Sequence, residues 1–111
     1  MRWISDRLNR PVAPPELSDA GYRLLGGRLV AGPRGAAALF VYESAHGKRL
    51  AVYLRPMPSA RRTSIERIDI GDLDGCVWLD HGIGYSLIAD ETYDKLLELS
   101  RYVRREVGTE G

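Results

Sequence analysis

Hydrophobic positions repeat every second residue through the middle of the chain and every three or four residues near its end. The first repeat is typical of strands with one buried face, and the second of an amphipathic helix. Residues 22–30 predict one strand, in which Gly26 and Gly27 produce a bulge or a bend. Residues 36–43 are apolar at almost every position, which predicts a central strand covered on both faces.

A hairpin is predicted next. Residues 48–55 alternate in polarity, and Gly47 lies in the short gap that separates them from residues 36–43. Residues 56–63 contain two prolines and two adjacent arginines and show no periodicity. We interpret residues 56–63 as an exposed, mobile connection between two halves of one sheet, not as a boundary between domains.

Alternation resumes after this connection and predicts a meander of three more strands. They are expected within residues 64–70, 76–80 and 83–89. An Asp-Gly pair predicts a turn within residues 72–75, and a second tight turn is expected at residues 80–82. All the strands therefore fall within residues 22–89 and form an antiparallel sheet of about six strands.

The end of the chain predicts an amphipathic helix over residues 91–107, with Asp90 as its N-cap and Gly108 as its stop. Its apolar face consists of Tyr93, Leu96, Leu97, Ser100, Val103 and Val107. Its last turns carry cations that complement the helix dipole, namely Arg101, Arg104 and Arg105. A short helix is also expected over residues 2–9. The predicted fold class is α+β, a single domain over residues 1–111 with the C-terminal helix packed on one face of the sheet.

Composition places the chain among globular domains and excludes several classes. Its 111 residues suit one domain, and 44% hydrophobic with 28% charged residues exclude a disordered chain or a fibre. The net charge of +1 excludes the global basic field that drives non-specific nucleic-acid binding. No uncharged stretch approaches the roughly 20 apolar residues of a membrane span. The one cysteine, Cys76, excludes an internal disulfide.

Candidate catalytic and metal-binding groups are few. His46 and His81 are the only histidines, both are expected in turns, and no Gly-x-Ser-x-Gly motif occurs. A zinc site would use these histidines with Cys76 and Asp80, but the paired short spacings of such sites are missing. We therefore expect no catalytic residue, metal or cofactor. A hydrolase that uses His81 as its general base is kept as a hypothesis that ranks below the two given at the end of this section.

Other motifs have structural explanations. The glycines at residues 26–27 and at residue 47 do not lead into a helix, so they predict a bulge and a hairpin and not a phosphate-binding loop. Four aromatic residues fall in predicted strands: Tyr42, Tyr53, Trp78 and Tyr85. They could stack on nucleic-acid bases, but the near-neutral charge favours core packing.

Several short segments, taken in order, resemble a known family. They are Trp3-Ile-Ser-Asp-Arg-Leu8, Arg10-Pro-Val12, Pro15-Glu-Leu-Ser18, residues 21–29, residues 37–43, Gly47-Lys-Arg-Leu50, Val52-Tyr-Leu54, Trp78-Leu-Asp80, Gly82-Ile-Gly-Tyr85 and the leucines Leu96, Leu97 and Leu99. Their order and spacing, over most of the chain, resemble the C-terminal extracytoplasmic domain of proteobacterial membrane-anchored anti-sigma factors, also described as transmembrane transcriptional regulators.

The resemblance implies a parent protein with three parts. A cytoplasmic segment would bind a sigma factor, one helix would span the inner membrane, and this domain would lie on the periplasmic side. The first two parts are absent from the sequence, so we expect Met1 to begin a fragment. The resemblance implies a protein partner, membrane attachment through the absent span and no direct contact with nucleic acid. No catalytic or ligand-binding residue is carried over from the family.

Two functional hypotheses lead. The first is a non-catalytic sensory or interaction domain of an anti-sigma factor, which regulates transcription through an extracytoplasmic-function sigma factor. The alternative is a stand-alone module whose sheet binds a small apolar or lipid-like ligand. Arg61 and Arg62 have no structural requirement apparent from the sequence, so we predict a partner-docking loop at residues 56–63. The unpaired edges of the sheet are a second candidate surface.

Overall fold

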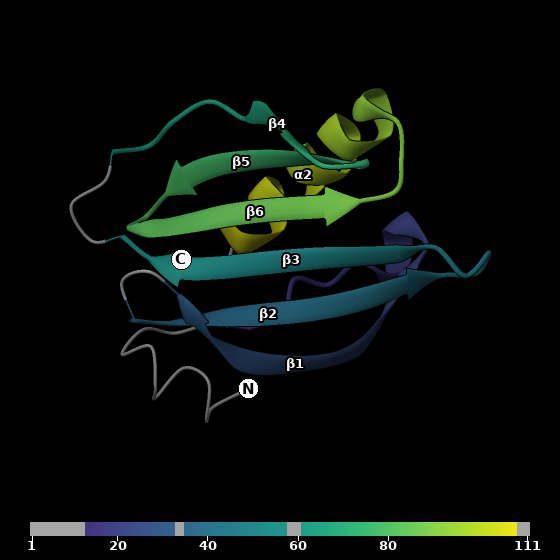
Figure 1. The fold of residues 1–111 in the computed structure, drawn as a ribbon, viewed down its shortest axis with the longest axis horizontal. Helices are drawn as coiled ribbons and strands as arrows, with labels where there is room; N and C mark the ends of the chain where they lie inside the picture. The colour runs from purple at the N-terminus through teal and green to yellow at the C-terminus, as the bar shows by residue number, and fades with distance from the viewer. Residues whose placement is uncertain (1–12, 33–34, 58–60, 109–111) are drawn as a thin grey trace.

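The computed structural model describes residues 13–32, 35–57 and 61–108, and it forms one antiparallel sheet with a helix on one face (Figure 1). Its strands are β1 (Tyr22–Gly32), β2 (Gly35–Ser44), β3 (Arg49–Pro56), β4 (Glu66–Ile70), β5 (Leu73–Asp80) and β6 (Ile83–Ala89). A 3-10 turn, η1 (Ser18–Ala20), precedes the sheet, and helix α2 (Tyr93–Gly108) follows it. The predicted α+β class is confirmed. The short helix predicted over residues 2–9 lies outside the described residues.

The strand order in the sheet is β1-β2-β3-β6-β5-β4. The sheet therefore consists of two three-stranded meanders, joined where β3 pairs with β6. Val52 lies opposite Leu87 at this junction. Because β4 is an edge strand, the connection after β3 has to cross the ends of β6 and β5 before the chain re-enters the sheet.

The tight turns follow the local chemistry of the chain. His81 and Gly82 have φ values of 51° and 76°, which suit the two-residue hairpin between β5 and β6. The turn predicted within residues 72–75 is wrong in position, because Asp74 and Gly75 pair with β4. Gly71, with a φ of 62°, provides the left-handed residue of the actual turn.

The bulge predicted in β1 is confirmed. The register with β2 shifts between Leu24 and Gly26, so that Leu24 lies opposite Tyr42 and Gly26 opposite Val41. One extra residue on β1 bends the strand at the edge of the sheet.

The prediction that β2 is covered on both faces is wrong. Phe40 and Tyr42 are buried on the side of α2, whereas Leu39 and Val41 on the other side are only half-buried. An apolar run indicates that both faces of a strand are hydrophobic. It does not indicate whether a second layer of structure covers each face.

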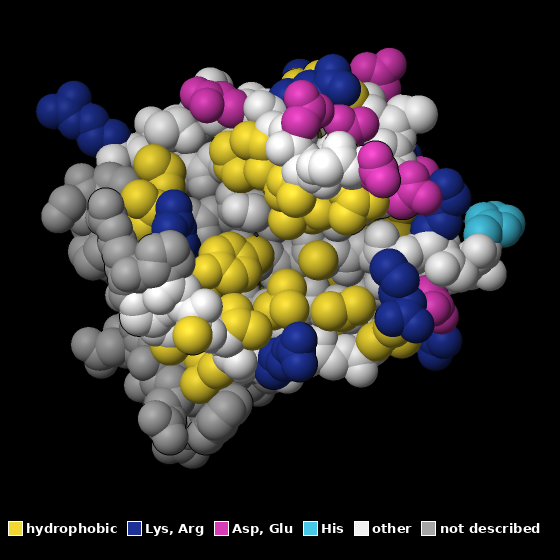
Figure 2. Space-filling view, viewed as in Figure 1, with side chains coloured by type: hydrophobic (Ala, Val, Ile, Leu, Met, Phe, Trp, Pro, Cys, Tyr) yellow, Lys and Arg dark blue, Asp and Glu magenta, His cyan; other side chains and the backbone are white. Residues whose placement is uncertain are grey.

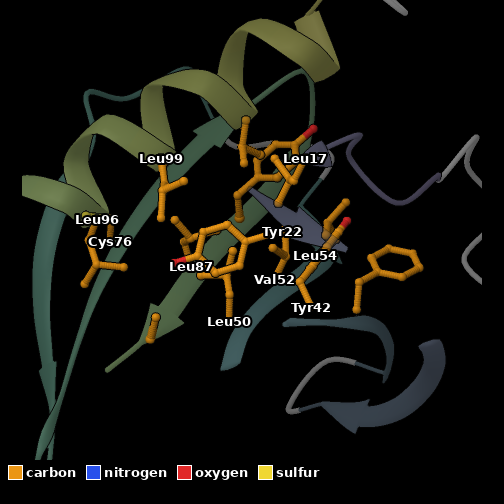
Figure 3. Packing of buried hydrophobic residues seen from close by; sticks show 14 of the residues in the cluster. Leu17, Tyr22, Tyr42, Leu50, Val52, Leu54, Cys76, Leu87, Leu96 and Leu99 are labelled. Atoms are coloured by element: carbon orange, nitrogen blue, oxygen red, sulfur yellow. The ribbon is translucent and has the colours of Figure 1, made fainter. Parts of the chain in front are cut away.

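The core lies between the sheet and α2. Leu96 and Leu99 point from the helix toward sheet residues that include Cys76 and Leu87 (Figure 3). The rings of Trp78 and Tyr85 stack across β5 and β6, with centroids 5.2 Å apart. At the other end of the core, the Tyr42 hydroxyl donates a 2.7 Å hydrogen bond to the Pro15 carbonyl, which fastens the segment before η1 to β2.

Helix α2 begins later than predicted. Asp90 is not its N-cap; the Thr92 hydroxyl accepts a 3.3 Å hydrogen bond from the Lys95 amide, as a cap does. The neighbouring Glu91 is engaged elsewhere, because its carboxylate accepts a 3.0 Å hydrogen bond from the Tyr22 hydroxyl. The helix start is thereby joined to β1, the strand at the far edge of the sheet.

Candidate functional site

The face of the sheet opposite α2, called here the outer face, is apolar over most of its width. The strand registers place on it Leu39 and Val41 (β2), Ala51 and Tyr53 (β3), Ile88 (β6), Val77 and Leu79 (β5), and Ile68 and Ile70 (β4). Within the described part of the chain no helix covers this face, because α2 packs on the other side (Figure 1). Figure 2, taken from this side, shows hydrophobic side chains spread across the sheet with charged side chains around them.

The central residues of the outer face are half-buried by their neighbours, and those at the β4–β5 edge are more open. Ile70 is 42% exposed and Leu73 is 39% exposed, high values for large aliphatic side chains. A contiguous apolar patch of this kind marks an interaction surface more often than isolated exposed leucines do. The outer face is therefore the leading candidate for a functional surface.

Two shallow grooves indent the outer face. The first, of about 350 Å³, lies over β1 and β2 and is lined by Leu25, Gly26, Gly27, Arg28, Leu39, Val41 and Arg49. The second, of about 260 Å³, lies over the ends of β5 and β6 and includes Arg55, Met57, Val77 and Leu79. A Cβ atom on Gly84 would lie 2.9 Å from the Met57 sulfur, so the glycine allows Met57 to lie against the sheet.

An ion-pair row forms the polar border of the first groove. Glu43 accepts hydrogen bonds from Arg49 at 2.8 Å and from Arg23 at 3.2 Å. These hydrogen bonds, the one from Arg49 first, lower the pKa of Glu43. The three side chains lie side by side on β3, β2 and β1, so the carboxylate is held ionised between two cations at the end of the sheet.

The predicted docking residues Arg61 and Arg62 differ in their surroundings. Both are exposed, but Arg62 Nε lies 3.5 Å from Oδ1 of Asp80, a carboxylate buried at the end of β5. Arg62 therefore has a structural partner that the sequence did not reveal. For both arginines, docking stays a prediction.

The connection that carries these arginines is attached to the sheet at both ends. The Met57 amide donates to the Gly82 carbonyl at 2.7 Å, and the Thr63 amide donates to the Leu79 carbonyl at 3.0 Å. The Leu79 amide in turn donates to the Thr63 hydroxyl at 2.9 Å. Met57 and Thr63, within the segment predicted to be mobile, are therefore hydrogen-bonded to the sheet. Residues 58–60 of that segment lie outside the described residues.

The groups considered for catalysis or metal binding are dispersed. His46 lies in the β2–β3 hairpin and His81 in the β5–β6 turn, at opposite ends of the sheet, and Cys76 is buried in the core. His81 Nδ1 is 3.2 Å from Oδ1 of Asp80. Over the described ranges, no three His, Cys, Asp or Glu side chains lie close enough together to hold a metal ion.

The four strand aromatics do not form one exposed platform. Tyr42, Trp78 and Tyr85 are buried on the side of α2, and Tyr53 alone lies on the outer face. The preference for core packing over base stacking is confirmed for the three buried rings.

Comparison of the chain with known protein families, with curated proteins and with solved structures found no match in any of the three. Among the described helices, none has the length and apolar character needed to cross a membrane.

Proposed function

We propose that this chain is a non-catalytic sensory or interaction domain, and that its outer face binds a protein partner. The observation that carries the proposal is the apolar outer face, which extends from β2 to β4 and is uncovered by any described helix. The wider assignment rests on the resemblance described above. In that assignment, the domain belongs to a membrane-anchored anti-sigma factor, lies on the periplasmic side of the inner membrane and regulates an extracytoplasmic-function sigma factor.

The shape of the surface favours a protein over a small apolar ligand. Pockets for small molecules enclose most of the ligand in one concavity. Here the apolar side chains spread over five neighbouring strands, and the two grooves are separate. An extended apolar centre with charged groups at its border matches the anatomy of protein interfaces. The border is formed here by Arg28, Arg49 and Glu43 at one end and by Arg55 and Glu66 at the other.

The regulatory role can be tested by deleting the gene that encodes this chain. If the domain belongs to an anti-sigma factor, deletion releases a sigma factor, and the transcripts of that sigma factor rise. Unchanged transcription from every promoter of the extracytoplasmic-function class would contradict the anti-sigma assignment.

The role of the outer face can be tested in the same cells with single substitutions. Val41→Glu places a charge on the outer face, in the groove over β1 and β2, and we expect it to impair regulation while the protein stays folded. Leu24→Glu is the matched control, because Leu24 is 40% exposed and lies on the opposite side of the sheet. Equal effects of the two substitutions would count against the outer face as the binding surface.

The lipid-ligand alternative makes a different prediction. Native mass spectrometry of the purified chain would then show a bound lipid-sized mass that disappears in Val41→Glu. That result would replace the protein-partner proposal with the alternative.

A further inference from the structure

A cluster of arginines surrounds a buried carboxylate at the end of the sheet, away from the outer face. Asp80, the last residue of β5, is 5% exposed. Its Oδ1 lies 3.5 Å from Arg62 Nε and 3.2 Å from His81 Nδ1, and its Oδ2 lies 3.4 Å from Arg104 Nε. Three parts of the chain meet here: the β3–β4 connection, the β5–β6 turn and the second half of α2.

A cavity of about 350 Å³ opens beside this carboxylate. It is lined by Arg62, Asp80, His81, Arg101, Arg104 and Arg105. Four arginines and a single carboxylate therefore line the cavity, and its lining keeps a positive charge even with His81 neutral. Of the four arginines, Arg62 and Arg104 are paired with that carboxylate. A concave surface lined by charges of one sign concentrates ions of the opposite sign.

Arg104 gives a second, independent indication of an anion. Its side chain is 13% exposed, and its Nε and Nη2 atoms are buried with no hydrogen-bond partner among the described residues. The contact of Nε with Asp80 at 3.4 Å is an ion pair without hydrogen-bond geometry. Buried guanidinium donors without acceptors are costly. Arg104 also lines the adjoining cavity, and an oxyanion is the acceptor that suits a guanidinium group best.

We propose that this cavity binds a phosphate-type oxyanion. Arg101, Arg104 and Arg105 project from one face of α2 because they are spaced by three and four residues. Arg62 reaches the same cavity from the β3–β4 connection. Guanidinium forks that converge from two elements suit a tetrahedral anion with several oxygens better than a planar carboxylate, which one fork can satisfy.

The binding test uses inorganic phosphate as the probe, in calorimetric titrations of the chain at constant ionic strength. We expect saturable binding of phosphate that is stronger than the binding of acetate. Arg101→Gln and Arg105→Gln should each weaken phosphate binding roughly tenfold, the loss expected for one charge-assisted hydrogen bond. Both arginines are exposed, so these substitutions leave the core intact.

The matched control is Arg28→Gln, which removes the same charge from β1, outside this cavity. We expect it to leave phosphate affinity unchanged. If Arg28→Gln weakens binding as much as Arg101→Gln does, the attraction is a property of total charge and the proposal is overturned.

A vesicle arm distinguishes a free phosphate from a lipid headgroup. Vesicles of phosphatidylglycerol mixed with phosphatidylcholine are compared with pure phosphatidylcholine. Binding to the anionic vesicles that inorganic phosphate displaces, and that Arg101→Gln abolishes, would identify the headgroup as the source of the phosphate. Binding of inorganic phosphate alone would identify a free phosphate. Saturable binding of neither probe at millimolar concentration would overturn the proposal.

Discussion

Tyr22 shows how one side chain can join distant parts of this chain. It is almost fully buried at the start of β1, and its hydroxyl donates to the Glu91 carboxylate just before α2. Lys48, at the β2–β3 hairpin, lies 3.6 Å from the same carboxylate. Burial, and then the hydrogen bond to Glu91, raise the pKa of Tyr22 to about 12. The neutral hydroxyl is therefore the form that the fold stabilises.

This contact predicts a loss of stability at high pH. A raised pKa in the folded state contributes stability that is present below the ordinary tyrosine pKa of about 10 and is lost as the pH rises to about 12. We expect the free energy of unfolding, measured with urea, to fall over this window. In Tyr22→Phe the fall should be less steep. The other tyrosines with a raised pKa, Tyr42, Tyr85 and Tyr102, contribute to the fall that remains. Parallel curves for the two proteins would contradict this role of Tyr22.

Among the elements, α2 determines which face of the sheet becomes the core. It packs on β5 and β6 and buries Leu96, Leu99 and Val103 against them. Ser100 is also fully buried, and its hydroxyl has no hydrogen-bond partner among the described residues. Apolar contacts therefore dominate the attachment of the helix to the sheet.

Two neighbouring leucines of α2 should differ in their contribution to stability. Leu96 is 0% exposed, so Leu96→Ala should lower the free energy of unfolding by about 2–5 kcal/mol through lost burial and the cavity left behind. Leu97 is only half-buried, so Leu97→Ala should cost clearly less. Denaturant midpoints of both variants would measure the difference. Similar midpoints would show that the helix is packed in another rotation.

At the scale of the whole molecule, the two faces of the sheet differ in burial although both are hydrophobic. One side is largely covered by α2, η1 and the segment before it, and Leu24 near the β1 edge is an exposed large hydrophobic residue on this side. The other side carries apolar residues on five strands without a described covering layer. A single sheet with one helix cannot bury both of its faces, so this architecture leaves apolar area for an additional contact.

This asymmetry predicts that the native protein binds a hydrophobic dye. We expect the fluorescence of anilinonaphthalene sulfonate to rise on addition of the folded chain, and to rise less with Val41→Glu. Leu24→Glu, on the other side of the sheet, should respond like the unsubstituted chain. Near-UV circular dichroism must stay unchanged, so that a loosened core is not the cause. If the folded protein does not increase the fluorescence of the dye, that result would argue against an accessible apolar face.

The sequence alone determined the elements of this protein to a large extent. Alternation between residues 22 and 89, together with the apolar run at residues 36–43, predicted the strands. The change to a helical repeat predicted α2, because both periods follow from local backbone geometry. The bulge near Gly26 and the turn at His81 and Gly82 also follow from local preferences. The turn at Gly71 was misplaced because the nearby Asp74 and Gly75 carry an equally strong turn signal, and only strand pairing decides between them.

Tertiary structure alone decided the surfaces. Whether the apolar run of β2 is covered depends on where α2 packs, and the sequence of β2 contains no information on that. Arg62, Asp80 and Arg104 are far apart along the chain, and they meet because the β3–β4 connection crosses the sheet end over which the second half of α2 lies. The periodicity of hydrophobic positions indicates which face of its own helix or strand a side chain lies on. Contacts between elements depend on how the elements pack, and a local pattern does not encode that.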